Sequence, residues 1–177
     1  MQGRQPRGFT LPEILCTLAV LAVVTGWALP SFRHLALDAA RNREVNGFLQ
    51  AVHLARSEAI KRNGVVSLCP SPDGIQCAAS TAWHGGWIVF VNADRDSPAV
   101  RDAGEELLRA HPAWEGGRIG SNRTTLSFRP YGQSGVTATV TFCDPRGSPA
   151  ARAVIISQTG RPRVTDRSSS GGPLSCT

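Results

Sequence analysis

Charged residues are scarce in this chain of 177 residues: they make up 18% of the sequence, against 41% hydrophobic residues. An intrinsically disordered chain would be richer in charge and poorer in apolar residues, so the composition argues against that class. The length suits one ordinary domain, or one domain with an appendage. The 18 Gly and 12 Pro are many for a helical bundle and favour a fold with many turns.

Motifs of catalysis and of metal binding are also missing. His84-Gly85-Gly86 is similar to part of an oxyanion-hole motif, but no Gly-x-Ser-x-Gly nucleophile elbow accompanies it. Asp94 and Asp96 have the spacing of a calcium loop, but Pro98 stands at a ligand position and the expected Gly is missing. The cysteines and histidines show no zinc spacing. We therefore expect no metal, no cofactor and no enzymatic activity, and we interpret the chain as an interaction protein.

The charge that is present is unevenly placed. The net charge is +6, from 19 basic and 13 acidic residues, and Lys61 is the only Lys. Residues 64–109 carry three basic and six acidic residues, whereas residues 110–177 carry eight Arg and three acidic residues. The C-terminal third is therefore basic, which permits an acidic partner such as nucleic acid without requiring one.

Residues 14–32 form a run of 19 residues without a charge. As a helix this run would span roughly 28 Å, close to the hydrocarbon thickness of a bilayer. Arg4 and Arg7 precede it, so the positive-inside rule keeps residues 1–8 in the cytoplasm and sends the rest across the membrane. A secretory signal peptide is the alternative, but its apolar run is usually only about 7–15 residues long. Glu13 at the start of the run would cost about 2.5–3.5 kcal/mol at membrane depth, which indicates a functional role.

The residues before the run are Arg7-Gly8-Phe9-Thr10-Leu11-Pro12-Glu13. This motif resembles the type III signal of type IV pilins and type II secretion pseudopilins. The resemblance implies that a prepilin peptidase cuts between Gly8 and Phe9 and methylates the new amino terminus of Phe9. It also implies that Glu13 neutralises the terminal amine of a neighbouring subunit, since a buried carboxylate needs a cationic partner. The protein would then cross the inner membrane once, with its globular part in the periplasm, before joining other major and minor pilins at the cell surface.

The rest of the chain predicts an α+β fold. Apolar residues follow helical spacing up to a stop signal at Asn63-Gly64, so we expect one helix from near Phe9 to Arg62, kinked at Pro30. Its second half should bury one face, made of Val45, Phe48, Leu49, Val52, Ala55, Ala59 and Ile60. Short strands should follow at 65–69, 87–91, 106–109, 125–129, 136–143, 153–158 and 163–165, with a flexible polar tail at 167–173. The expected organisation is a leader (1–8), a membrane and filament-core helix (9–32), an amphipathic helix (33–63) and a β domain (64–177).

The β half has a resemblance of its own. The segment Trp83-His84-Gly85-Gly86-Trp87-Ile88-Val89-Phe90 is similar to the Trp–Gly-Trp–Val-Phe signature of the GspH/FimT group of minor pilins. Phe128-Arg129-Pro130-Tyr131-Gly132 and residues 157–163 resemble later motifs of the same group. The resemblance implies a pilin-like fold, with a long N-terminal helix packed on a C-terminal antiparallel β domain of two sheets.

Four of the five cysteines lie beyond the apolar run, in an oxidising compartment if the topology holds. Four cysteines allow three pairings, of which we favour Cys69–Cys77 and Cys143–Cys176. The first closes a short loop and should contribute about 2–3 kcal/mol in the chain-entropy model, and the second closes a longer loop and should contribute nearer to about 4 kcal/mol.

Gly160-Arg161-Pro162-Arg163 is the segment most indicative of a ligand. Pro162 suits an exposed loop, and Arg side chains match phosphate oxygens. The segment resembles the Gly-Arg-x-Arg DNA-binding motif of the FimT-type minor pilins, which take up DNA in natural transformation. The resemblance extends only to Arg161 and Arg163 and their Gly160. Further arginines could widen the contact on grounds of charge alone: Arg146, Arg152 and Arg167, and, in a Gly/Asn-rich loop, Arg118 and Arg123.

The sequence places no aromatic residue among these arginines, so it indicates backbone contact to double-stranded DNA without base stacking or sequence preference. A solvated basic face and a membrane-surface role are the alternatives for the Arg cluster.

Two other functions share the same anchor and fold. One is a structural, FimU-like minor pilin that primes or caps the pilus, and the other is a GspH-type pseudopilin of a type II secretion system.

Overall fold

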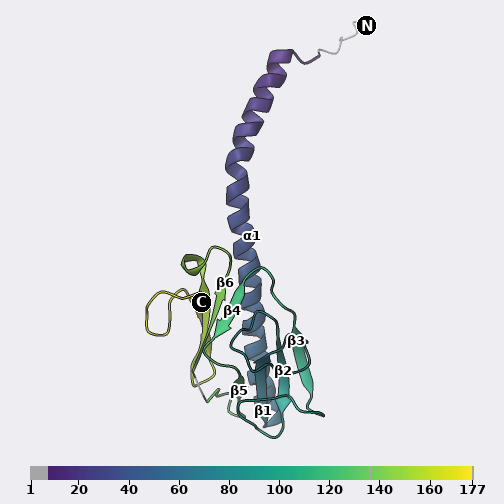
Figure 1. Ribbon diagram of the computed structural model, residues 1–177, viewed down its shortest axis with the longest axis vertical. Helices are drawn as coiled ribbons and strands as arrows, with labels where there is room; N and C mark the ends of the chain where they lie inside the picture. The colour runs from purple at the N-terminus through teal and green to yellow at the C-terminus, as the bar shows by residue number, and fades with distance from the viewer. Residues whose placement is uncertain (1–7, 136, 177) are drawn as a thin grey trace, which may run out of the picture. The chain divides into compact units, whose positions relative to one another are not determined.

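The computed structural model describes residues 8–135 and 137–176, including the side chains of all of these residues except 27–31. The chain divides into two compact units, Met1–Ala39 and Ala40–Thr177. Helix α1 (Leu11–Arg62) contributes to both units, and all the strands belong to the second (Figure 1). This is the α+β arrangement that the sequence predicts.

Both ends of α1 have recognisable signals. At the start, the Thr10 N–H donates a hydrogen bond to Oε2 of Glu13 at 3.4 Å, so the acidic side chain satisfies a donor that the helix leaves free. At the other end, Asn63 adopts a left-handed φ of 49°, and the Gly64 N–H donates to a carbonyl of the last turn. The predicted helix stop after Arg62 is confirmed.

The described part of the first unit is the beginning of α1 with the three residues before it. Many of its described large apolar side chains are exposed, among them Leu11, Ile14, Leu15, Leu18, Val20, Leu21, Val23 and Val24. Within the described residues, no helix reaches the length and hydropathy required of a membrane span.

The second unit contains two antiparallel sheets of four strands. The first has the order β3-β2-β1-β5, with β1 at Val65–Pro70, β2 at Trp87–Asn92, β3 at Leu107–His111 and β5 at Leu126–Phe128. The second has the order β4-β6-β7-β8, with β4 at Arg118–Ser121, β6 at Ala138–Cys143, β7 at Arg152–Ile156 and β8 at Pro162–Thr165. The strands β2 and β3 lie on one side of the second half of α1 and β6 lies on the other (Figure 1).

The core fills the space between this half of α1 and the two sheets. Phe48 is fully buried, and its ring meets Trp83, Trp87 and Phe142 edge-on at centroid distances of 5.7, 5.6 and 5.8 Å. Trp87 belongs to the first sheet and Phe142 to the second, so one helix side chain joins both. Burial of such a ring contributes about 1.5–3 kcal/mol, with a further gain from the edge-on geometry.

Three expectations need correction. Ile60, predicted to be buried, is 52% exposed because it lies in the last turn of α1. The end of its side chain approaches the loop at Gly132. Arg118 lies in strand β4 and not in a loop, since pairing with β6 creates a strand that has Ile119 as its only large apolar residue. The segment 167–173, expected to be a flexible polar tail, is a closed turn held by a bridge between its end residues and by two backbone hydrogen bonds inside it.

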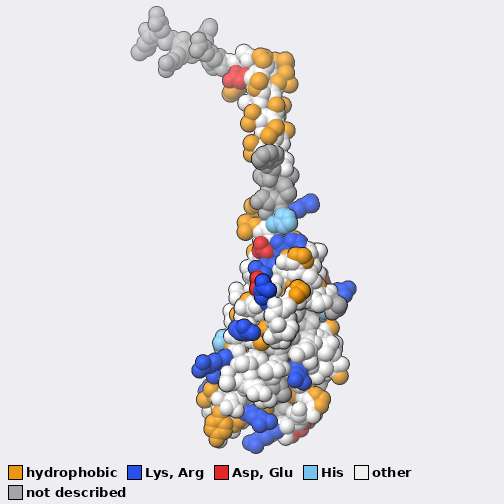
Figure 2. Space-filling view, turned by 90° about the vertical axis from the view of Figure 1, so that its left-hand side faces the viewer, with side chains coloured by type: hydrophobic (Ala, Val, Ile, Leu, Met, Phe, Trp, Pro, Cys, Tyr) orange, Lys and Arg blue, Asp and Glu red, His pale blue; other side chains and the backbone are white. Residues whose placement is uncertain are grey.

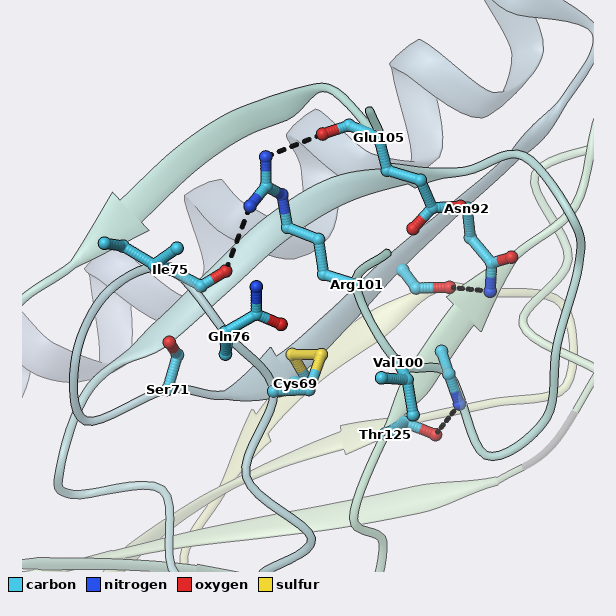
Figure 3. The surroundings of a disulfide bond; sticks show 12 residues. Cys69, Ser71, Ile75, Gln76, Asn92, Val100, Arg101, Glu105 and Thr125 are labelled. Carbon is cyan, nitrogen blue, oxygen red and sulfur yellow. Dashed lines mark hydrogen bonds between the residues drawn. A yellow bond between two sulfur atoms is a disulfide. The ribbon is translucent and has the colours of Figure 1, made fainter. Parts of the chain in front are cut away.

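Both favoured disulfides are present, Cys69–Cys77 and Cys143–Cys176. Figure 3 shows how the first is tied to the long loop between β2 and β3, because the Arg101 guanidinium donates to the carbonyls of Ile75 and Glu105 at 3.2 and 2.7 Å. The second disulfide holds the end of the chain against β6, beside a small buried cluster that includes Leu174. Each bridge therefore fixes a loop that the sheets alone would leave weakly attached.

Candidate nucleic-acid interface

The turn between β7 and β8 requires glycine at position 160. Gly160 has a φ of 73°, and its N–H donates to Ser157 O at 2.8 Å, which closes the turn. A Cβ at this position would lie 2.1 Å from Gly132 O, so the turn packs directly on the loop between β5 and β6. Gly160 thus serves the packing of two loops, and the arginines beside it face outward.

Arg161 and Arg163 are both exposed, on either side of Pro162. Arg163 pairs with Ile155 in the β7–β8 ladder, and the Ser157 N–H donates to Arg161 O at 3.2 Å, so the backbone of both arginines is held by β7. Among the described residues, no side chain or carbonyl forms an ion pair or hydrogen bond with either guanidinium. The two charges are therefore available to an external anion on a fixed backbone.

The loop beneath the turn is itself braced. Arg56 of α1 donates from Nε to Gly132 O at 2.9 Å. Ser134 is buried; its N–H donates to Gln158 O at 3.2 Å and its Oγ donates to Ser157 O at 2.9 Å. The helix, the β5–β6 loop and the β7–β8 turn therefore form one hydrogen-bonded unit.

Strand pairing places three loops at the end of the second unit where α1 ends. Val65, just after the helix, pairs with Asn92, so the loop that leaves β2 starts at this end. The loop that leaves β5 starts there as well, because Phe128 pairs with Val66, and the β7–β8 turn is bonded to it. We call residues 93–98, 129–135 and 157–161 the helix-end loops.

A groove of about 530 Å³ lies between two of these loops and is lined by Arg95, Arg123 and Arg129. All three arginines are exposed. Arg123 donates from Nε to Thr137 O at 3.2 Å. The acidic residue in the lining is Asp96. Its Oδ1 accepts a hydrogen bond from Nδ2 of Asn92, and its Oδ2 accepts one from the Val100 N–H. With three arginines and one aspartate in its lining, the groove has a net positive charge.

Two of these arginines, and one aromatic residue, are not among the residues that the sequence predicts for the site. Arg95 stands in an acidic segment, and Arg129 belongs to a motif that indicates only the family. Tyr131 is 86% exposed and lies between groove-lining Pro130 and Gly132, on which the β7–β8 turn packs. Tyr131 is thus two positions from groove-lining Arg129, an arginine that the sequence analysis does not assign to the site. The sequence signal that could have indicated these two residues is their position on either side of Pro130, as Arg129 and Tyr131.

The remaining predicted arginines lie elsewhere. Arg118 pairs with Cys143, and Arg152 pairs with Phe142, at the opposite ends of β4 and β7 from the helix-end loops. Arg146 donates to both carboxylate oxygens of Asp144, at 3.0 and 2.6 Å, and Arg167 donates to Gly171 O at 3.3 Å. The structure therefore separates four predicted residues from the Gly160 turn: Arg118, Arg146, Arg152 and Arg167.

The pairing of Arg146 has an electrostatic consequence. The hydrogen bond from Arg146 lowers the pKa of the Asp144 carboxyl from its usual value, although burial works in the opposite direction. Asp144 also meets Arg41 of α1 at 3.3 Å. This cluster links α1 to the loop that follows β6.

Basic side chains are spread over one broad face of the second unit, and acidic ones are few there (Figure 2). This is the face on which β6 and the chain's C-terminal region lie in Figure 1. The distribution matches the excess of Arg in residues 110–177.

At the N-terminus, Gly8 and Phe9 lie just before α1 and are exposed, Phe9 by 80%. Glu13 is in the first helical turn. Residues 1–7 of the expected leader are outside the described residues. A model of the prokaryotic N-terminal methylation motif matches residues 3–29, and the family model described as Type II transport protein GspH matches residues 44–160.

The chain belongs to the GspH family of pilin-like proteins. The pilin-like protein PilA1 of Thermus thermophilus is 34% identical over 168 residues, which cover 89% of this chain and 97% of that protein. A crystal structure of the type IV minor pilin FimU of Pseudomonas aeruginosa, in space group P65, superposes with a TM-score of 0.54 at 25% identity, covering 78% of this chain and 98% of that one. Its P21 crystal form shares the fold, with a TM-score of 0.56 at 24% identity over 82% of this chain and 98% of that one.

These comparisons confirm the predicted family and fold. The chain is a minor type IV pilin-like protein of the GspH and FimU type. The match to the methylation motif makes the N-terminus prepilin-like. A motif of this kind implies a pilin that a prepilin peptidase processes, that is anchored in the membrane and that assembles with other pilins.

Proposed function

We propose that this minor pilin binds extracellular duplex DNA without sequence preference, through the turn that bears Arg161 and Arg163, for uptake in natural transformation. The observation that supports the proposal is the pair of exposed guanidinium groups on a turn whose backbone is held by Gly160, Ser157 and the loop beneath. Because the backbone is already ordered, little conformational entropy is lost when the turn meets a phosphate chain.

The chemistry of this turn favours phosphate over bases. Arg forms bidentate charge-assisted hydrogen bonds with phosphate oxygens, and contacts of this kind carry no sequence information. Each phosphate contact releases counterions, so binding should weaken as salt rises, with a slope of about 0.9 for every phosphate neutralised on duplex DNA.

The test is duplex binding by the full chain in non-ionic detergent, measured by fluorescence anisotropy at several salt concentrations. The double substitution Arg161→Gln, Arg163→Gln should weaken binding to unrelated duplexes alike and reduce the salt slope by up to about 2. Both side chains are exposed, so the melting temperature should change little. Wild-type affinity and salt slope in the double variant would refute the proposal.

The matched control is Arg109→Gln. Arg109 is exposed on β3, which lies at the edge of the first sheet farthest from β5, and its hydrogen bond to Gln50 is long, at 3.5 Å. The substitution removes the same charge at a distance from the helix-end loops. Arg56 is unsuitable as a control because it holds Gly132 beneath the Gly160 turn.

We further propose that the peptidase cuts between Gly8 and Phe9, removing residues 1–8, and that Glu13 then pairs with the methylated amine of Phe9 in a neighbouring subunit. In this proposal, residues 9–32 anchor the protein in the inner membrane before assembly, and the domain from residue 64 onward lies in the periplasm. The exposed position of Gly8 and Phe9 ahead of α1 supports access by the peptidase.

A second candidate is a structural minor pilin that primes or caps the pilus, favoured by the likeness to FimU. The family description leaves a third, a pseudopilin of a type II secretion system. Neither candidate requires free arginines on the Gly160 turn. The DNA-binding test above therefore separates both from the proposed function.

A further inference from the structure

We infer that the helix-end loops form a binding site for single-stranded nucleic acid, in which Tyr131 stacks on a base and the adjoining groove holds the sugar–phosphate backbone. The inference rests on the proposed function and extends it, because it adds a second form of nucleic acid and a residue that contacts its bases. It starts from the exposure of Tyr131, the one Tyr of the chain.

An aromatic ring that is 86% exposed gives up the favourable burial of its apolar faces. The loop that carries the ring is held in place from below. The Gly132 N–H donates to Arg129 O at 2.7 Å, and the Arg129 N–H donates to Gln133 O at 2.9 Å. Gly132 is further fixed by Arg56 and by Gly160. Tyr131 is thus an outward-facing ring on a braced loop, which is the form of a stacking platform.

The positive groove is lined by the residues that precede Tyr131 in the chain. Pro130, the neighbour of Tyr131, lines the groove together with Arg129, and Ser134 of the same loop lines it as well. On the other side of the ring, Gly132 contacts Gly160, and Arg161 follows directly. A strand whose base rests on Tyr131 would therefore meet Arg129 in one direction and Arg161 in the other.

The groove favours a strand over a small anion. Its volume of about 530 Å³ is within the range of sites that hold molecules of nucleotide size. Three arginines at different points of the lining suit successive phosphates, as do the arginine tracks of single-strand binding proteins. Arg95 has a left-handed φ of 62°, a conformation that a residue with a side chain adopts at some cost, and its side chain lines the groove.

Stacking distinguishes a single strand from a duplex. Within a duplex, each base is already stacked on its neighbours and presents only its edges, so Tyr131 has no base face to meet except at an end. A single strand can present a base face at any position. The site should therefore respond to loss of the ring on single strands and be nearly indifferent to it on duplexes.

The experiment measures anisotropy of a labelled oligothymidine and of a labelled blunt duplex with the full chain in non-ionic detergent. Tyr131→Ala should weaken binding to the single strand by about 5- to 150-fold, the range that corresponds to one stacked base, and change duplex binding by less than about twofold. Tyr131→Phe keeps the ring and should bind like wild type. Arg95→Gln and Arg129→Gln should each reduce the single-strand salt slope by about 0.7, while Arg109→Gln should not.

Equal effects of Tyr131→Ala on both probes, no effect on either, or a Tyr131→Phe variant as weak as Tyr131→Ala would each overturn the inference. These outcomes are separate from failure of the proposed function, which is decided on duplex DNA by Arg161→Gln, Arg163→Gln. A chain that binds neither probe would overturn both.

Discussion

Replacing Gly160 by alanine should detach the arginine-bearing turn from the loop beneath it. The added methyl carbon would lie 2.1 Å from Gly132 O and 3.2 Å from the carbonyl carbon of the same residue, both of them backbone atoms that cannot rotate away. The left-handed φ of 73° adds about 1–2 kcal/mol for any residue with a Cβ. Relief of the overlap by backbone shifts adds about 1–3 kcal/mol. We therefore expect Gly160→Ala to lower the free energy of unfolding by about 2–5 kcal/mol.

Gly171→Ala is the matched control. Gly171 has a φ of 86°, but a Cβ there would meet nothing within 4 Å, so only the backbone cost of about 1–2 kcal/mol applies. At roughly 4 °C per kcal/mol for a unit of this size, the melting temperature should fall by about 8–20 °C for Gly160→Ala and by about 4–8 °C for the control. Thermal unfolding followed by near-ultraviolet circular dichroism measures both. Equal losses in the two variants would refute the packing argument, because the contact with Gly132 would then contribute nothing.

Two further predictions follow from the N-terminus and from the Asp144 cluster. Gly8→Arg should leave an uncut precursor in the membrane of the native host, and mature-size protein from this variant on an immunoblot would contradict the proposed cleavage site. Arg146 lowers the pKa of Asp144 in the folded state. The Asp144 carboxylate therefore contributes its full stabilisation above the pKa of the unfolded state, and this stabilisation is lost as the pH falls through the lower pKa of the folded state. The urea midpoint of wild type should therefore fall more steeply below about pH 4 than that of Asp144→Asn, and parallel pH profiles would contradict this.

Local signals in the sequence are sufficient for much of the fold. The helical spacing of Val45, Phe48 and Val52 identifies the buried face of α1, because side chains three and four residues apart lie on one side of a helix. The left-handed end of α1 at Asn63 is also predictable, because it depends on a few neighbouring residues. The two disulfides are predictable because four cysteines allow only three pairings.

Strand β4 cannot be predicted from local sequence signals. Its four residues, Arg-Ile-Gly-Ser, have no β-branched run and include a glycine, so their composition indicates a loop. Ladder hydrogen bonds with β6 make the segment a strand, and burial of Ile119 in the core stabilises it. Pairing with a distant strand is a tertiary effect, which a pass along the chain does not detect.

The grouping of the arginines depends on tertiary structure in the same way, and this shows how the interface should be defined. Arg152 is nine positions from Arg161, but the intervening strand β7 rises about 3.3 Å per residue and carries Arg152 to the far end of the sheet. Arg129 is much farther away in sequence, yet its loop is joined to the Gly160 turn by the contact between Gly132 and Gly160. In an antiparallel domain, residues gather by the end of the sheet to which their loops belong. An interface of this kind is therefore identified from strand register, and the substitutions that test it belong in the helix-end loops.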